Sequence, residues 1–295
     1  MLKTNLTHKM RSFLKYVFSA LLLVSVLAGC DKEYESIEEV DERKIQSYIT
    51  AQNLTLVKDS SGFYYQILSP GTGEAPKNSE IVYYTYTAKS VDGKEYFTAN
   101  SYASGSGFLG YVRPEGWRLA LNKINKGGKI RVVFPSSLGF GRNPTNGFDG
   151  NEVLDSELEL FNSQPELDDV LINRFMTGNA LSGFNKTSGG VYYKVIAPGT
   201  GTEPVKLTDS ITAAYTGRLL KGSTFDSATT AAPLKTRLEL LIKGWQEAVP
   251  FIKKGGKIRI LIPSAFGYGN DTSKPTIPPN SVLDFDVELI DVKTQ

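Results

Sequence analysis

The chain has one histidine and one cysteine among its 295 residues, and both lie near its start. If the segment that contains His8 is removed and Cys30 is modified, the remaining protein has no imidazole and no free thiol. This excludes Ser-His-Asp and Cys-His catalysis, zinc sites built on His or Cys, and structural disulfides. Carboxylate pairs, hydroxyl nucleophiles, lysine and oxygen-ligated metals remain open.

An excess of charge of either sign is also missing. The chain has 33 basic and 31 acidic side chains, and four of the basic ones lie in the first 15 residues. The remainder is therefore close to neutral and holds no block of like charge, which argues against nucleic acid as a partner. The length is sufficient for two domains of ordinary size.

Residues 1–29 have the pattern of a secretory signal. Basic residues come first, an apolar run covers residues 16–27, and small residues precede Cys30. The run is too short to cross a bilayer, which needs roughly 20 helical residues. A buried core helix is the alternative, but the run has no polar face and Asp31 and Lys32 follow it almost directly.

The segment Leu-Ala-Gly-Cys at 27–30 resembles the lipobox of bacterial lipoproteins. The resemblance implies that Cys30 carries acyl chains such as palmitate and becomes the first residue of the mature protein. Two or three acyl chains hold a protein on a membrane, at about 0.8 kcal/mol per buried methylene. We therefore expect a lipid-anchored protein of the cell envelope, with the outer membrane favoured, and an acidic tether at 30–40.

The rest of the chain repeats itself at a nearly constant spacing. Gly-Gly-Lys-Ile-Arg occurs at 127–131 and again 128 residues later, at 255–259. A Pro-Gly-Thr-Gly segment, a Gly-Trp pair and a Gly-aromatic-Gly segment recur in the same order, and Asn151 to Leu160 returns as Asn280 to Leu289. Two copies of domain size indicate a duplication rather than a solenoid.

Each copy predicts the same order of elements. A helical stretch comes first, with Ile45, Tyr48 and Ile49 on one face in the first copy and Leu171, Phe175 and Met176 in the second. A short amphipathic helix begins at each Trp and ends at the Gly-Gly pair. Strands are predicted at 63–68 and 83–86, and at 191–196, 211–216, 257–262 and 282–292. The sequence thus predicts the α+β class, with two domains that each wrap an antiparallel sheet on a short helix.

The predicted domain boundaries follow from this repeat. They are 1–29 for the signal, 30–40 for the tether, 41–162 for the first domain with its leading helix, 163–189 for a linker with a helix, and 190–295 for the second domain.

The second copy holds six motifs in a fixed order. They are Tyr-Thr-Gly-Arg-Leu at 215–219, Gly-Ser-Thr-Phe-Asp-Ser at 222–227, Leu-Ile-Lys-Gly-Trp at 241–245, Phe-Gly-Tyr-Gly at 266–269, Ile-Pro-Pro-Asn at 277–280 and Leu-Asp-Phe-Asp-Val-Glu-Leu at 283–289. Each alone has a commoner explanation, since a Trp on an amphipathic helix is usually a core residue. In this order and spacing they closely resemble FKBP-type peptidyl-prolyl isomerases over residues 190–292.

The resemblance implies a curved antiparallel sheet that clasps one short helix and an apolar pocket for a proline ring. It makes Trp245 the floor of that pocket and Tyr215, Phe225 and Phe285 its walls. The family often has an aromatic residue at the position of Leu234, so we expect an altered substrate preference here.

The resemblance also implies roles for the edge of the pocket. Leu241 and Ile242 line this edge, and the backbone N–H of Ile242 holds a substrate carbonyl. Tyr268 donates its hydroxyl to the substrate, Asp226 lies at the rim, and Ile277 closes the mouth.

The first copy keeps the framework and loses these groups. Tyr86, Tyr96 and Trp117 match Tyr215, Phe225 and Trp245. The replacements are Phe97 for Asp226, Pro114 for Ile242, Phe140 for Tyr268 and Ser156 for Phe285, and no Ile-Pro-Pro occurs in 142–150. Because proline has no N–H, the backbone donor is lost as well. We predict that this domain is degenerate and non-catalytic, and that it binds protein or spaces the second domain from the membrane.

The leading hypothesis is a peptidyl-prolyl cis-trans isomerase that assists the folding of exported proteins, with its activity in the second domain. Two alternatives stay open: a non-catalytic chaperone or assembly module that uses FKBP-like domains, and a purely structural lipoprotein. The expected partners are proline-containing polypeptides, a membrane through the lipid anchor, and the macrolide inhibitors of the family. We expect no cofactor, no metal and no nucleic acid.

Overall fold

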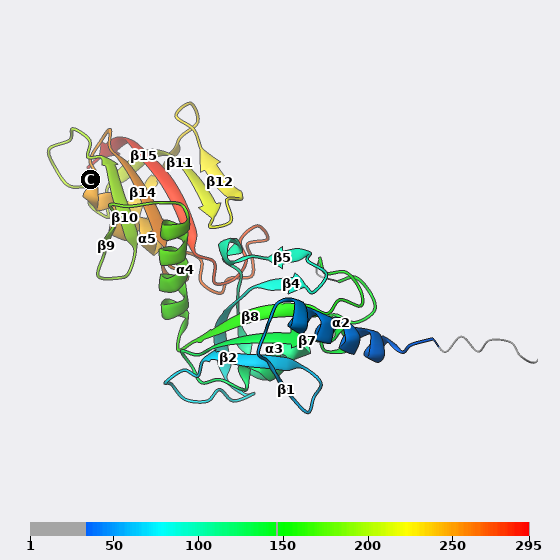
Figure 1. Ribbon diagram of the computed structural model, residues 1–295. Coiled ribbons are helices and arrows are strands. Elements are labelled where there is room, and N and C mark those ends of the chain that lie inside the picture. The colour runs from blue at the N-terminus through cyan, green and yellow to red at the C-terminus, as the bar shows by residue number, and fades with distance from the viewer. Residues whose placement is uncertain (1–33, 146, 295) are drawn as a thin grey trace, which may run out of the picture. The chain divides into compact units, whose positions relative to one another are not determined.

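The computed structural model describes residues 34–145 and 147–294, in which the topology of one domain occurs twice (Figure 1). The predicted signal, the lipobox and Cys30 lie outside the described residues. Within those ranges, no helix is both long enough and apolar enough to cross a membrane.

The first domain begins with helix α2 (Ile37–Ala51), and its strands follow the order β1-β2-β7-β8-β3-β6, with β4 paired to β5 and β8. The strands are β1 (Val57–Lys58), β2 (Tyr64–Ser69), β3 (Ile81–Tyr86), β4 (Ala88–Ser90), β5 (Glu95–Phe97), β6 (Ser104–Phe108), β7 (Lys129–Phe134) and β8 (Leu154–Phe161). Helix α3 (Glu115–Leu121) and the 3₁₀ turns η1 (Ala99–Ser101), η2 (Leu109–Tyr111) and η3 (Ser136–Leu138) connect them.

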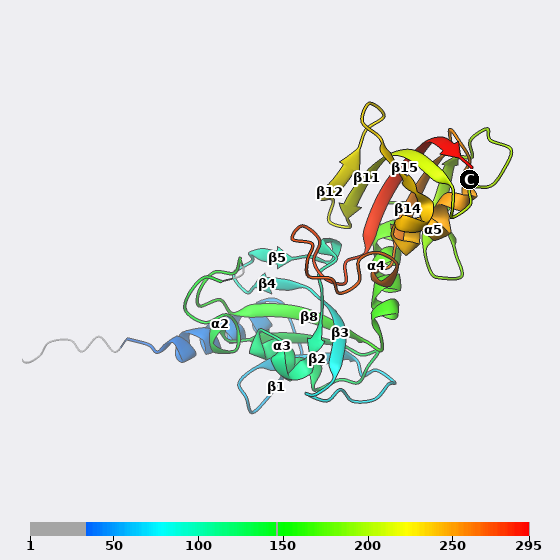
Figure 2. The ribbon, with the colours of Figure 1, turned by 180° about the vertical axis from the view of Figure 1, so that it is seen from behind.

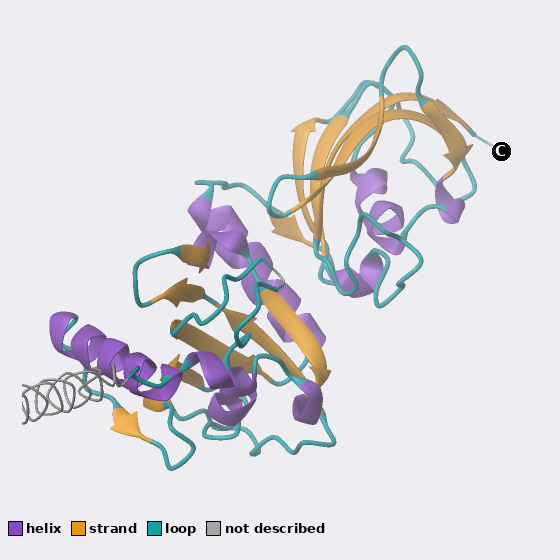
Figure 3. Ribbon diagram, turned by 90° about the vertical axis from the view of Figure 1, so that its right-hand side faces the viewer, coloured by secondary structure: helices purple, strands orange, loops and turns teal. Residues whose placement is uncertain are grey.

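The second domain begins with helix α4 (Gln164–Gly178), and its strand order is β12-β11-β15-β14-β10-β9, with β13 paired to β11. The strands are β9 (Asn185–Lys186), β10 (Tyr192–Ala197), β11 (Ser210–Leu219), β12 (Thr224–Ala228), β13 (Leu234–Arg237), β14 (Lys257–Ile262) and β15 (Leu283–Lys293). The remaining elements are α5 (Lys243–Ala248), η4 (Leu238–Leu240), η5 (Val249–Phe251) and η6 (Ser264–Phe266). Figure 3 shows the strands of this domain curving around its short helix.

The strand pairs of both sheets are antiparallel within the described residues, which confirms the predicted α+β class. The short helices also have the predicted apolar stripe: Trp245, Ala248, Val249 and Ile252 are all buried. Helix α5 is shorter than the stripe, because Pro250 has no N–H to continue the ladder and the chain turns into η5.

Two helices cover opposite faces of each sheet. In the second domain, Ile260 and Ile262 share a core with Trp245 of α5, whereas Leu261 between them packs with Ile172 of α4. Because neighbouring residues of a strand point to opposite faces, α5 and α4 must lie on opposite sides of β14. Figure 2 shows α5 lying on one face of the sheet, beside β14.

The first domain repeats this arrangement. Val132 and Phe134 share the core of Trp117, and Val133 packs with Ile45 of α2. The leading helices, whose apolar faces were predicted from the sequence, therefore dock on the outer face of their own sheets. The helix in the range 163–189, predicted as part of a linker, packs in this way on the second domain.

Local signals start both leading helices. Before α2, the Ser36 hydroxyl accepts a hydrogen bond from the Glu39 N–H, and the Glu39 carboxylate accepts one from the Ser36 N–H. This reciprocal pair is a capping box. Before α4, the Ser163 hydroxyl accepts from the Glu166 N–H, and Pro165 occupies the first turn.

Candidate active site

Five aromatic side chains of the second domain pack on its core near the end of β11. We call them the aromatic cluster: Tyr215 on β11, Phe225 on β12, Trp245 on α5, Tyr268 after η6 and Phe285 on β15. Trp245 and Phe285 are buried, and the other three rings are half-buried, so one side of the cluster reaches solvent. The structure thus brings together the residues that the sequence analysis assigned to the floor and walls of a pocket.

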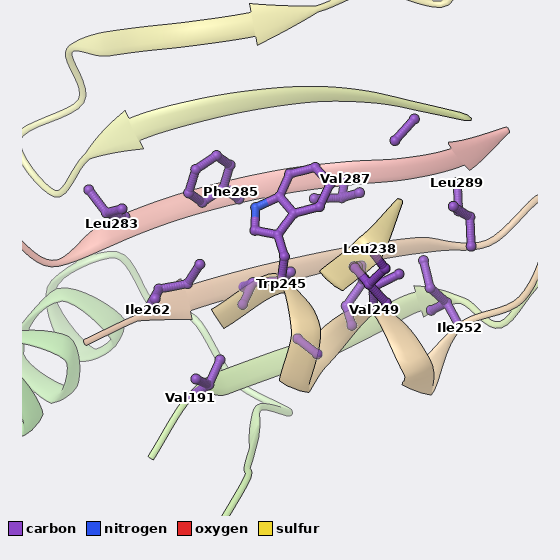
Figure 4. Close-up of a cluster of buried hydrophobic side chains, with 14 of the residues drawn as sticks. Val191, Leu238, Trp245, Val249, Ile252, Ile262, Leu283, Phe285, Val287 and Leu289 are labelled. Carbon is purple, nitrogen blue, oxygen red and sulfur yellow. The ribbon is translucent and has the colours of Figure 1, made fainter. Parts of the chain in front are cut away.

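Four ring pairs of the cluster meet edge to face, and a fifth, Tyr215 with Phe285, is tilted at 50°. Figure 4 shows the indole of Trp245 rising from α5 toward β15, where it lies beside Phe285. The ring centroids of Trp245 are 5.3 Å from Tyr215 and 5.6 Å from Phe285, at interplanar angles of 89° and 86°. Phe225 meets Phe285 at 5.6 Å and 83°. Each such contact contributes about 0.5–1.5 kcal/mol beyond burial, which holds the rings in place.

A glycine that the sequence analysis missed makes this packing possible. A Cβ atom on Gly217 would lie 2.6 Å from the Phe285 ring and 2.8 Å from the Phe225 ring, closer than real atoms approach. Gly217 is part of the Tyr-Thr-Gly motif on β11, and a glycine inside a strand is the signal that marks such a close approach.

Asp226 and Tyr215 form the polar rim of the cluster. The Tyr215 hydroxyl donates to the Asp226 carboxylate at 2.6 Å, and the Ser227 N–H donates to its other oxygen at 2.8 Å. Burial and this hydrogen bond raise the pKa of Tyr215. Asp226 itself is exposed.

Several hydrogen-bond donors at the cluster have no partner among the described residues, and two of them lie where the resemblance places contacts with a substrate. These two are the Tyr268 hydroxyl and the backbone N–H of Ile242, which is the N-cap residue of α5. Burial, and to a lesser extent the charge of Asp226, raises the pKa of Tyr268, so its hydroxyl stays protonated at neutral pH. Both groups are therefore available to an acceptor on a ligand.

Gln246, which the sequence analysis did not single out, fixes the segment before Ile242. Its side-chain amide donates to the carbonyls of Glu239 (3.0 Å) and Leu241 (2.7 Å). Nothing in the sequence marks this residue, because the hydrogen bonds depend on how the chain folds back before α5.

The other predicted site residues lie at different depths. Leu241 and Ile242 are half-buried and pack against the core. Ile277 is only 6% exposed and belongs to the same buried core as Trp245 and Phe285. Leu234 is half-buried on β13, where it pairs with Ala213, and it is not among the side chains packed on this core.

The corresponding site of the first domain is filled by its own side chain. Phe148 is 3% exposed, and its ring stacks on Phe140 at a centroid distance of 4.1 Å. It also contacts Tyr96 at 4.3 Å and Phe97 at 5.9 Å. The sequence shows that Ile-Pro-Pro is missing from this loop, but the role of Phe148 becomes visible only in the structure.

Phe148 can be recognised in the sequence by its distance from an Asn turn that both domains share. Asn151 and Asn280 both have positive φ, and each donates its N–H to the glycine carbonyl of the aromatic turn, at Gly141 and Gly269. Phe148 precedes the first Asn by three residues, as Ile277 precedes the second. A large ring therefore stands where the second domain has a smaller side chain.

The floor of the first site also differs. The Trp117 indole N–H donates to the Ser156 hydroxyl at 2.9 Å, and both residues are buried. Ser156 pairs with Val132 as Phe285 pairs with Ile260, which confirms that they are equivalent. Pro114 is the N-cap of α3, so the domain has no N–H at the place of Ile242.

The two regions of the sequence that build these sites both match a known protein family. The model of FKBP-type peptidyl-prolyl cis-trans isomerases matches residues 72–161 and again residues 201–290, which together make up more than half of the chain. The chain belongs to this family. The chain therefore has two FKBP domains, as the internal repeat predicted.

Relatives of known sequence cover part of the chain. It is 46% identical over 112 residues to the FKBP-type peptidyl-prolyl cis-trans isomerase FkpA of Escherichia coli K12, covering 38% of this chain and 41% of that protein. It is 39% identical over 121 residues to the peptidyl-prolyl cis-trans isomerase Mip of Coxiella burnetii, covering 40% and 52%. The chain thus spans about half of the length of these curated relatives, or less.

Solved structures of the family are similar in part. The crystal structure of Escherichia coli FkpA has 41% sequence identity and a TM-score of 0.38, covering 41% of this chain and 57% of that one. A peptidyl-prolyl cis-trans isomerase from Pseudomonas syringae pv. tomato has 32% identity and a TM-score of 0.39, covering 45% and 98%.

Proposed function

We propose that this chain is a peptidyl-prolyl cis-trans isomerase and that its second FKBP domain carries the activity. The observation that supports this best is the pair of unpartnered donors, the Tyr268 hydroxyl and the Ile242 N–H, beside an aromatic cluster with one open side. The first domain has neither donor and fills the equivalent place with Phe148.

The chemistry needs no nucleophile. Rotation about a prolyl amide faces a resonance barrier of ~18–20 kcal/mol, and no bond is made or broken. Aromatic surroundings disfavour the charge-separated planar amide relative to the twisted one, and fixed donors favour the twisted geometry selectively. A rate gain of ~10⁴ requires about 5.5 kcal/mol. Trp245 and Phe285 supply the apolar surface, Ile242 and Tyr268 the donors, and Asp226 orients Tyr215.

The test is isomerisation of a proline peptide by the full chain carrying Asp226→Ala and Tyr268→Phe. A neutral hydrogen bond contributes about 0.5–1.5 kcal/mol, so we expect Tyr268→Phe alone to lower kcat/KM about 2- to 10-fold. The double variant is expected to lose more. Turnover equal to that of the unaltered chain would show that these roles are wrong.

The matched control is Tyr193→Phe. Tyr193 belongs to the same domain and packs on the same core, but its ring stacks on Phe251 at 4.1 Å and lies outside the aromatic cluster. The same chemical change at this position is expected to leave kcat/KM unaltered.

The assay also separates an enzyme from a binding module. Turnover that a macrolide inhibitor of the family suppresses supports the isomerase. Macrolide binding without turnover supports the alternative, a chaperone or assembly factor that uses the site only to hold client segments.

We further propose that the chain is anchored in the cell envelope through acyl chains on Cys30 and acts there on exported, proline-containing polypeptides. The Leu-Ala-Gly-Cys segment and the basic, then apolar, start support this. Growth with a labelled fatty acid followed by fractionation is expected to place label and protein in the membrane fraction, and Cys30→Ser to abolish both. Label that persists in Cys30→Ser would contradict the assignment.

A further inference from the structure

The position of Tyr268 depends on Ser264. Ser264 begins the 3₁₀ turn η6, which leads directly into the segment that carries Tyr268. Its carbonyl accepts hydrogen bonds from the N–H groups of Gly267 (3.0 Å) and Gly269 (2.8 Å), one on each side of Tyr268. A shift of Ser264 would therefore move the Tyr268 hydroxyl.

Ser264 is in turn held by a buried carboxylate on α4. One oxygen of Asp168 accepts from the Ser264 N–H at 2.8 Å and from the Ser264 hydroxyl at 2.7 Å. The other oxygen accepts from the Gln164 side chain at 2.7 Å. Both Asp168 and Ser264 are 1% exposed, so water does not compete for these bonds.

Packing fixes Asp168 itself. It lies on the face of α4 that docks on the sheet, where Ile172 is fully buried and packs with Leu261 and Tyr192. A buried carboxylate is costly unless hydrogen bonds satisfy it, which favours a defined position over a loose one. This helix lies outside residues 201–290, the region that the family model matches.

We propose that Asp168 is a positioning residue for the isomerase site: through Ser264 it sets where Tyr268 presents its hydroxyl. The inference rests on the proposed function of the second domain. It extends the functional unit to the leading helix, whose buried apolar residues belong to a different core cluster from Trp245 and Phe285.

The first domain provides an internal control. There the Asp41 carboxylate on α2 accepts from the Ser136 N–H at 2.9 Å and from its hydroxyl at 2.7 Å. The Ser136 carbonyl accepts from the glycines on both sides of Phe140. The arrangement is therefore inherited by both copies, but only in the second does the turn carry a hydroxyl.

The experiment is a double-mutant cycle in the full chain with Asp168→Ala and Tyr268→Phe, read out as kcat/KM for a proline peptide. Asp168→Ala alone is expected to lower kcat/KM by no more than Tyr268→Phe does, about 2- to 10-fold. In the Tyr268→Phe background the same substitution is expected to change little, because its target hydroxyl is already gone. Equal losses in both backgrounds, or no loss in the unaltered background, would overturn the proposal.

Two variants separate positioning from loss of stability. Asp41→Ala removes the same hydrogen bonds in the first domain and is expected to leave kcat/KM unchanged. Asp168→Asn keeps an amide oxygen that accepts from Ser264, so it is expected to restore most of the activity. If Asp168→Ala does not fold, Ser264→Ala, which keeps the backbone N–H, replaces it in the cycle with the same expectations.

A second readout does not depend on turnover. In the full chain with ring-labelled tyrosine, the NMR signals of Tyr268 are those that vanish in Tyr268→Phe. They are expected to shift in Asp168→Ala and to stay in place in Asp41→Ala. A Tyr268 shift in a chain without isomerase activity supports the positioning role and rejects the proposed function, whereas unmoved signals reject the positioning role.

Discussion

Gly217 and Phe285 of the second domain are both replaced in the first domain, and the two replacements are coupled. In the second domain, Gly217 leaves room for the Phe285 ring, and strand pairing sets Gly217 opposite Asp226. In the first domain, Ala88 occupies the place of Gly217, opposite Phe97, and Ser156 replaces the ring. A Cβ atom at this place would lie too close to a ring at the place of Phe285, so the methyl group of Ala88 and the loss of the ring go together.

This coupling predicts the effect of Gly217→Ala. The new methyl group would push the Phe285 and Phe225 rings apart, and overpacking of this kind costs about 1–3 kcal/mol of folding free energy. We expect lower stability in denaturant and lower kcat/KM together. The reverse change in the first domain, Ala88→Gly, is expected to cost about 0.5–1 kcal/mol and to leave activity intact. A fully active and fully stable Gly217→Ala would contradict the close approach.

The hydrogen bond between Tyr215 and Asp226 makes a prediction about ionisation. Burial, and then the Asp226 carboxylate, raises the pKa of Tyr215 above its usual value of 10.0. A raised tyrosine pKa stabilises the fold below the unfolded pKa, and this stabilisation is lost as the pH rises through the folded pKa. Neutral pH therefore leaves the rim intact.

Asp226→Asn is expected to lower the pKa of Tyr215 without restoring the ordinary value, because burial is the larger cause. The measurement is an ultraviolet titration of tyrosinate in the full chain, with Tyr215→Phe to identify the signal. A Tyr215 that titrates at the same pH with and without the Asp226 charge would show that the bond does not form in solution.

At the scale of elements, hydrophobic periodicity predicted most of the secondary structure. The predicted strand at 257–262 coincides with β14, and that at 282–292 differs from β15 by one residue at each end. Periodicity shows that a face is buried but not what covers it, so the docking of α2 and α4 on the outer faces of the sheets could not be predicted. Asp41 and Asp168 were likewise missed, because a buried acid leaves no apolar pattern.

The docking of the leading helices predicts a matched pair of cavity variants. Ile45 on α2 and Ile172 on α4 are both fully buried against their own sheets. Replacing a buried isoleucine by alanine costs about 2–5 kcal/mol. Ile172→Ala is expected to lower the temperature at which activity is lost, whereas Ile45→Ala is expected to destabilise the first domain only.

The two tryptophans allow the unfolding of each domain to be followed separately in the full chain. The sequence has only two, and Trp117 and Trp245 lie in the cores of the first and second domains. With fluorotryptophan, each domain therefore gives one fluorine NMR signal. Unfolding of the Trp245 signal at an unchanged temperature in Ile172→Ala would show that α4 does not contribute to the second domain.

At the scale of the whole molecule, the repeat revealed from sequence alone that the copies are unequal. Pro114, Phe140 and Ser156 were recognised because each aligns with a motif of the second copy. Phe148 was not, because loop 142–150 lacks the Ile-Pro-Pro motif and only the spacing from Asn151 relates Phe148 to Ile277, while its role depends on a ring that folds back into the site. The structure therefore changes the description of the first domain from an emptied site to a filled one.

A filled site in the first domain predicts the stoichiometry of ligand binding. A macrolide inhibitor of the family is expected to bind once per chain in a calorimetric titration, and to shift the fluorine signal of Trp245 but not that of Trp117. Phe148→Ala removes a buried ring, at a cost of about 3–5 kcal/mol, and opens the first site. Even so, we expect no gain in isomerase activity, because Pro114 supplies no N–H and Phe140 no hydroxyl. Two binding events in the unaltered chain, or new turnover in Phe148→Ala with Tyr268→Phe, would show that the first domain retains a competent site.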